Sequence, residues 1–129
     1  MEIGIKNKKE FIVTEEMLAV HVGSGEVHVL ATPEIVVAVE NTAAASVKPF
    51  LKESDTTVGT DVHISHIAAT PAGMKFFVET NLAEISANGK ILTFLVSVYD
   101  EKEKISEGTH QRAIVRKERF ESKAAAKLS

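Results

Sequence analysis

The chain has 129 residues, of which 44% are hydrophobic and 26% charged, with a net charge of −3 and no cysteine. This length predicts a single domain over residues 1–129, with a real core but small enough to favour oligomerisation. The composition excludes a disulfide framework, a thiolate nucleophile and a cysteine metal site, and it gives no general attraction to nucleic acid or anionic membranes. Residues 1–11 lack the apolar run of a signal peptide and no stretch approaches ~18 apolar residues, so we expect a cytoplasmic protein.

The first part of the chain alternates short apolar segments with turns. Residues 9–13 (KEFIV) predict a short strand, and residues 14–16 a turn or helix start. The apolar residues 17–22 end at the flexible sequence Gly23-Ser24-Gly25, which lacks the lysine and the spacing of a phosphate-binding loop. Residues 26–31 predict a second brief strand.

A buried helix is predicted from Thr32 to about Lys48. The sequence T-P-E at residues 32–34 is a strong helix start, in which the hydroxyl of Thr32 is expected to cap free backbone N–H groups. Residues 35–47 are apolar on nearly every side, which is typical of a buried helix. The helix should end near Lys48, because Pro49 disfavours helical geometry in the residue before it.

Glu40 stands out within this helix. It lies roughly 100° from the narrow polar stripe of the helix, and its neighbours at helical spacing are apolar. An ionised carboxylate in such surroundings is costly unless it has a partner. Two interpretations remain open: Glu40 reaches water or pairs with a structural cation, or it is a working carboxylate whose ionisation is perturbed by its surroundings.

The rest of the chain predicts four long antiparallel strands. Their expected bounds are residues 56–70, 74–87, 90–99 and 104–119, with a strong hairpin signal at Asn88-Gly89 and a frayed, charged tail over residues 121–129. The economical packing of one buried helix and such a meander is a curved sheet wrapped around the helix, which is an α+β fold of the hotdog type. A sheet of this kind leaves an edge open, so we expect a homodimer or a higher oligomer.

His66 is predicted to face the same interior as Glu40. In a regular strand over residues 56–70, Val58, Thr60, Val62 and Ile64 share a face with His66, and this apolar face should meet the helix. A lone histidine on such a face is usually a hydrogen-bonded core residue. A second ionisable group on the facing helix favours an acid/base pair, in which His66 polarises or protonates Glu40.

Three other observations bear on the site. His63 and His66 fall on opposite faces of a regular strand and no third ligand is evident, so we do not expect a metal site. The hydroxyl at the start of the helix could contact a substrate carbonyl, beside backbone N–H groups that suit an oxyanion. His110 and Arg112 share a face of the last strand, and Arg116 lies further along it. These residues form either a solvated strand face or a basic patch that binds a phosphate-bearing substrate.

Several segments together resemble one family. These are V-L-A-T at residues 29–32, V-G-T at 58–60, H-I-A-A-T-P-A-G at 66–73 and G-T-H-Q-R-A-I at 108–114, in one register with Glu40. Over residues 30–120 they resemble the fluoroacetyl-CoA thioesterase family of hotdog proteins. Upstream of the helix, where the fluoroacetyl-specific pattern has a longer lid with phenylalanines, residues 19–32 contain no aromatic side chain.

The resemblance implies a catalytic set of Thr32, Glu40 and His66 for thioester hydrolysis, with the carboxylate as nucleophile or as base for water. It also implies that Gly59 lies near the acyl pocket, where a missing side chain allows close approach.

We therefore expect a metal-free, homodimeric acyl-CoA thioesterase that converts a short or small acyl-CoA to the acid and free CoA. No cofactor is expected, because coenzyme A is part of the substrate. Arg112 and Arg116 are candidate ligands for the phosphates of CoA. Neither nucleic acid nor a membrane is an expected partner. The alternatives are a non-catalytic acyl-CoA or metabolite-binding module, and a structural protein in which Glu40 and His66 form a buried ion pair.

Overall fold

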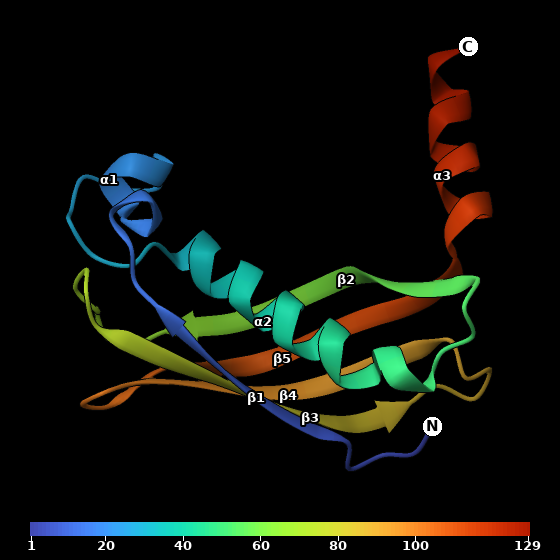
Figure 1. The fold of residues 1–129 in the computed structure, drawn as a ribbon, viewed down its shortest axis with the longest axis horizontal. Coiled ribbons are helices and arrows are strands. Elements are labelled where there is room, and N and C mark those ends of the chain that lie inside the picture. The colour runs from blue at the N-terminus through green and yellow to red at the C-terminus, as the bar shows by residue number, and fades with distance from the viewer.

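One antiparallel sheet crossed by a long helix makes up the body of the protein (Figure 1). The computed structural model describes all residues 1–129. The strands are β1 (Lys6–Ile12), β2 (Asp55–His66), β3 (Lys75–Ile85), β4 (Ile91–Asp100) and β5 (Lys104–Arg116), and the helices are α1 (Ala19–Val22), α2 (Thr32–Val47) and α3 (Lys117–Ala125), with 3₁₀ turns at Glu15–Met17, Lys48–Phe50 and Ala126–Leu128. None of the helices is both long and apolar enough to cross a membrane.

The sheet has the strand order β1-β3-β4-β5-β2, and every neighbouring pair is antiparallel. Strands β3, β4 and β5 follow one another as hairpins, as the Asn88-Gly89 signal predicted, and β1 and β2 are the two edges. This arrangement of a sheet with one central helix confirms the predicted α+β architecture.

The core lies between α2 and the sheet. Ile35, Val39 and Val47 of the helix are completely buried and belong to one hydrophobic cluster with Phe76 and Phe94 of the sheet. Their spacing places them on one helical face, which drives the helix onto the strands. The expectation of burial on nearly every side is wrong, since Val37 on the opposite face is 58% exposed.

The strands expected over residues 56–70 and 104–119 end earlier, at His66 and Arg116, and two other segments form a different structure altogether. Residues 26–31 form no strand; they are a loop whose backbone hydrogen bonds join it to Met17, Ala19, Val20 and Thr70, with a single bridge between Leu18 and Leu30. The supposed frayed tail is helical, because alanine, lysine and glutamate are strong helix formers. As α3 it projects away from the sheet and buries no residue (Figure 1).

A β-bulge in β2 decides which residues of that strand face α2. The pairing with β5 runs from Gly59 opposite Arg112 directly to Asp61 opposite Gln111, so Thr60 is an extra residue. A bulge shifts the alternation of side chains by one position. Thr60 is therefore exposed rather than internal, and both Gly59 before the bulge and His66 after it lie on the face toward α2.

Candidate active site

Glu40 lies in the second half of α2 and pairs with Arg112 of β5. Its Oε2 atom is 3.4 Å from Nη1 of Arg112, and the side chain of Glu40 is 40% exposed while that of Arg112 is only 8% exposed. The carboxylate thus has a cationic partner below it and solvent above it. This geometry explains how an apolar helix tolerates an acidic residue, and it leaves the carboxylate accessible to a substrate.

Arg112 is held on its other side by Thr57 of β2. Its Nε atom donates to the hydroxyl of Thr57 at 2.8 Å, and Nη2 donates to the carbonyl of Thr57 at 3.0 Å. Burial lowers the pKa of Arg112, and the Glu40 carboxylate opposes that shift. The interpretation of His110 and Arg112 as a solvated strand face is wrong, because both side chains are buried against the helix side of the sheet.

His110 completes this group of polar residues. Its Nδ1 atom is 2.8 Å from the backbone carbonyl of Asp61, and its Nε2 atom is 3.2 Å from Nη1 of Arg112. Burial is the largest influence on this histidine and lowers its pKa, while the bond to the Asp61 carbonyl opposes the shift. The ring also stacks on Phe94, with 6.2 Å between the ring centroids.

Gly59 lies directly against the Glu40 carboxylate. A Cβ atom built at this glycine would be 2.1 Å from Oε2 of Glu40 and 3.4 Å from Nη1 of Arg112. Only a residue without a side chain lets the carboxylate approach the strand this closely. We call Thr57, Gly59, Glu40, His110 and Arg112 the carboxylate cluster.

Thr32 and His66 form a second polar contact. The Thr32 hydroxyl is 2.7 Å from Nδ1 of His66. The predicted capping role of Thr32 is wrong, because the helix begins with Ala31 at its N-cap and no side chain caps it. Thr32 is instead the first helical residue, and its hydroxyl is directed to the strand that lies beside it.

His66 has one nitrogen without a partner. Burial lowers the pKa of His66, and the nearby backbone of Ala68 opposes that shift. Its Nε2 atom is buried and makes no hydrogen bond within the protein. A buried polar atom without a partner is costly, so it is a natural contact for a bound molecule.

Glu40 and His66 do not bond to each other, contrary to the predicted acid/base pair. Each has a different partner, Arg112 for the carboxylate and Thr32 for the imidazole. Helix geometry gives the reason: Thr32 and Glu40 are separated by two turns, which is about 12 Å along the axis. Because His66 lies beside the first turn, it is far from Glu40. The site therefore consists of two separate parts on the same face of the sheet, the carboxylate cluster and the Thr32–His66 pair.

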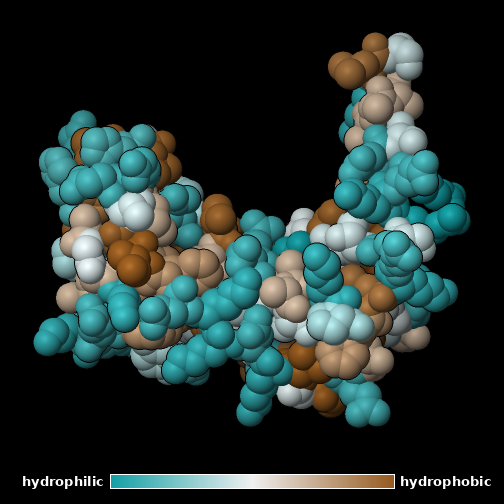
Figure 2. Space-filling model, viewed as in Figure 1, coloured by the Kyte–Doolittle hydropathy of each residue, from teal (hydrophilic) through white to brown (hydrophobic).

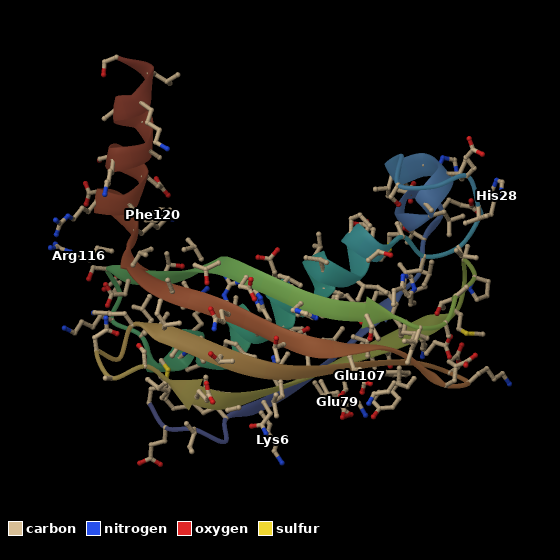
Figure 3. All side chains as sticks on the ribbon, turned by 180° about the vertical axis from the view of Figure 1, so that it is seen from behind. Lys6, His28, Glu79, Glu107, Arg116 and Phe120 are labelled. Carbon is tan, nitrogen blue, oxygen red and sulfur yellow. The ribbon has the colours of Figure 1, made fainter.

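Arg116 lies apart from both. It ends β5 and is exposed at the base of α3, where Figure 3 shows it close to Phe120. At about 3.3 Å per residue, it is roughly 13 Å along the strand from Arg112. A cavity of about 410 Å³ is found here. Its lining contains no carboxylate and consists of Lys90, Ile114, Val115, Arg116, Arg119, Phe120 and Lys123.

His63 contributes to neither part of the site. It pairs with Thr109 and is exposed on the face of β2 away from α2, as the odd spacing from His66 predicted. The structure contains no group of three or more metal-ligating side chains.

Sequence reasoning missed Thr57 and the linking position of His110. A strictly regular strand puts Thr57 on the outer face, and only the bulge brings it inside. The one available signal was Gly59, since a glycine within a strand often marks a bulge or a close backbone approach. His110 and Arg112 do lie side by side on the same face of β5, as predicted.

Comparison with solved structures shows the class of protein to which this fold and site belong. A crystal structure of a thioesterase superfamily member from Thermus thermophilus matches with a TM-score of 0.87 and 27% identity, over 97% of this chain and 91% of that one. A structure of a fluoroacetyl-CoA thioesterase matches with a TM-score of 0.92 and 29% identity, over 98% of this chain and 97% of that one. The fold is thus the hotdog fold predicted from the sequence, and the protein is a thioester hydrolase that acts on acyl-CoA.

The particular family follows from the sequence. The family model described as fluoroacetyl-CoA-specific thioesterase matches residues 13–118. The curated fluoroacetyl-CoA thioesterase of Streptantibioticus cattleyicolor is 33% identical over 99 residues, which cover 77% of this chain and 70% of that protein. The chain belongs to the fluoroacetyl-CoA-specific thioesterase family, which confirms the resemblance on which the sequence analysis relied.

Proposed function

We propose that the protein hydrolyses a short or small acyl-CoA thioester at Glu40, giving the acid and free CoA. The observation that carries this proposal is the placement of the Glu40 carboxylate. It is pressed against Gly59, paired with the buried Arg112 and still 40% exposed. A carboxylate that is fixed from below and open from above is suited to meet an acyl carbon or a water molecule.

Two routes are consistent with this geometry. In the first, a Glu40 oxygen bonds to the acyl carbon, the C–S bond breaks with release of the CoA thiolate, and water then cleaves the resulting anhydride. In the second, Glu40 accepts a proton from a water molecule whose oxygen attacks the acyl carbon, and the departing thiolate takes up that proton. In both routes Arg112 holds the carboxylate in position through the contact of its Nη1 atom with Oε2.

Thr32 and His66 then act on the thioester carbonyl. The lowered pKa of His66 keeps its ring neutral near neutral pH, so the ring has one N–H and one bare nitrogen. Because His66 lies about 12 Å along α2 from Glu40 of its own chain, we place the carbonyl oxygen between the first turn of α2 and the free Nε2 atom of His66 in one copy, and the attacking Glu40 in the second copy of the homodimer proposed below. Thr32 orients the imidazole.

The phosphates of CoA are assigned to the cavity at the base of α3. Arg112 is a poor candidate because its side chain is buried and four of its five guanidinium N–H donors are occupied by Thr57, His110 and Glu40. Arg116 remains, and it lines this cavity together with other cations and the half-exposed ring of Phe120, although it also lines a second cavity that contains Glu53, Glu118 and Glu121. Cations bind phosphate oxygens, and an aromatic ring offers a stacking surface for the adenine.

The assembly that we propose is a homodimer in the cytoplasm with no cofactor beyond the CoA of the substrate. Strand β2 is an edge of the sheet, and its outer backbone groups have no partner strand within the chain. An open edge is a ready surface for a second copy. The Thr32–His66 pair and Gly59 both involve this edge strand, so pairing there would bring the sites of two copies close together.

The decisive experiment measures release of free thiol from a panel of acyl-CoAs. The protein has no cysteine, so a thiol-specific reagent detects the released CoA without background from the enzyme. We expect Glu40→Gln to lower kcat by at least about 100-fold while the melting temperature stays near that of the wild type. The matched control is Glu79→Gln, on the face of the sheet away from α2 (Figure 3), and it should turn over normally.

The same panel separates the alternatives. Full turnover by Glu40→Gln would refute the proposed chemistry. A wild type that binds acyl-CoA without turnover would establish the binding module instead, and a wild type without affinity for any acyl-CoA would favour a structural role. Because residues 18–31 contain no aromatic side chain, we expect less than about tenfold discrimination between acetyl-CoA and fluoroacetyl-CoA.

A further inference from the structure

His110 is a buried histidine whose hydrogen-bond partners determine its tautomer. Its side chain is completely buried, with Nδ1 2.8 Å from the Asp61 carbonyl oxygen and Nε2 3.2 Å from Nη1 of Arg112. A carbonyl oxygen can only accept a hydrogen bond, and a guanidinium can only donate one. Nδ1 must therefore carry the proton, and Nε2 must present its lone pair to Arg112.

The contact with Arg112 connects His110 to Glu40. Nη1 of Arg112 is shared, since it is 3.2 Å from His110 and 3.4 Å from Oε2 of Glu40. Thr57 holds the Nε and Nη2 side of the same guanidinium. The two N–H bonds of Nη1 thus have two acceptors, and the loss of either one would leave this end of the planar guanidinium held by a single hydrogen bond.

The charges around His110 require its neutral form. The groups that face it are Asp61 from β2, Arg112 from its own strand and Glu40 from α2, while β4 contributes only the uncharged ring of Phe94. A proton on Nε2 would remove the acceptor for Arg112 and place a second cation beside it. Burial and Arg112 both lower the pKa of His110, in agreement with this requirement.

We propose that His110 is a positioning residue that, as the neutral Nδ1-protonated tautomer, fixes Arg112 and through it the Glu40 carboxylate. The chain of contacts begins at the bulge in β2, whose Asp61 carbonyl accepts the bond from the ring. This inference rests on the proposed function, in which Glu40 does the chemistry. It assigns the last strand a part in catalysis without any contact to the substrate.

A pair of substitutions separates the two bonds of the imidazole. The amide of His110→Asn occupies the position of Nδ1, so it can bond to Asp61 but does not reach Arg112. The amide of His110→Gln occupies the position of Nε2 and presents an oxygen to Arg112. We expect His110→Asn to lower kcat by about tenfold or more with KM almost unchanged, and His110→Gln to retain kcat within about threefold. His63→Asn, on the outer face of β2, is the matched control.

Two further readouts complete the test. Long-range ¹H–¹⁵N correlation of the wild type should show a protonated Nδ1 and a bare Nε2 at neutral pH, and a protonated Nε2 would overturn the inference. Equal losses of kcat in the two variants, in proportion to their loss of melting temperature, would show a merely structural role and also overturn it. If Glu40→Gln is inactive while both His110 variants match the wild type, only this inference fails. If Glu40→Gln is fully active, the proposed function fails first.

Discussion

Gly59→Ala is the substitution that tests the carboxylate cluster most directly. The new methyl carbon would be 2.1 Å from Oε2 of Glu40 and 3.2 Å from its carboxyl carbon, whereas ordinary van der Waals contact begins at 3.4 Å. Gly59 does not have a positive φ, so the backbone accepts alanine without strain. The clash is therefore confined to the end of one flexible side chain, which must retreat by more than about 1 Å.

The consequences for activity and for stability differ in size. A displacement of about 1 Å in a catalytic group can cost about 100-fold in rate, and we expect a loss of kcat of that order. The free energy of unfolding should change little. The weakened pair between Arg112 and the 40% exposed Glu40 costs at most about 1 kcal/mol after solvent screening, and replacing glycine by alanine offsets a similar amount through the unfolded chain.

The assay combines thiol release with thermal unfolding of the same samples. Gly25→Ala is the matched control, because its added Cβ would have an ordinary contact of 3.5 Å with Ala19 and its φ is not positive. A Gly59→Ala enzyme with wild-type kcat would refute the reasoning, since it would mean that the rate does not depend on the present position of the carboxylate. A variant that fails to fold would show instead that the side chain of Glu40 cannot move.

Three further predictions follow from the geometry. Thr32→Val should lower kcat by about tenfold or more, whereas Thr32→Ser should retain it, as steady-state kinetics would show. Denaturant titration should show for neither variant the loss of about 1 kcal/mol in the free energy of unfolding that is expected for a lost helix cap. Burial lowers the pKa of His66 and of His110 below the unfolded value, so the unfolded chain takes up more protons as the pH falls below about 6.5. The melting temperature should therefore fall on acidification, over the window between that value and the folded-state pKa values, and His110→Gln should flatten this dependence. The double variant Arg116→Ala, Arg119→Ala should raise KM for acyl-CoA several-fold with little change in kcat, and this difference should disappear with a thioester substrate that lacks the nucleotide. An unchanged KM would refute the assignment of the phosphate site to the base of α3.

The shape of the molecule supports two separate tasks for its two ends. Figure 2 shows a hollow between the lobe that contains α1 and the projecting helix α3. Thr32 and His66 are near the α1 end of α2, and the cationic cavity is at the α3 end of β5. The carboxylate cluster lies between them. A CoA thioester is a long molecule with a reactive acyl end and a charged nucleotide end, so this separation fits its two chemically different parts.

The amino-acid sequence by itself determined the class of fold and the chemistry of the family. The apolar helix after T-P-E and the Asn88-Gly89 hairpin follow from local preferences that operate over a few residues, and they predicted the sheet with its central helix correctly. The motifs around Thr32, Gly59 and His66 were enough to identify the family, because they depend on residue type and spacing alone.

Only the tertiary structure decided how the ionisable residues are partnered. A single extra residue at Thr60 moved Thr57 and Gly59 to the face of the sheet toward α2, and no local preference shows where a strand will bulge. Glu40 acquired Arg112, which is 72 residues away in the chain, and Thr32 acquired His66 instead of capping its own helix. Such pairings depend on the register between distant segments, which is set by the packing of the whole core and which local periodicity does not contain.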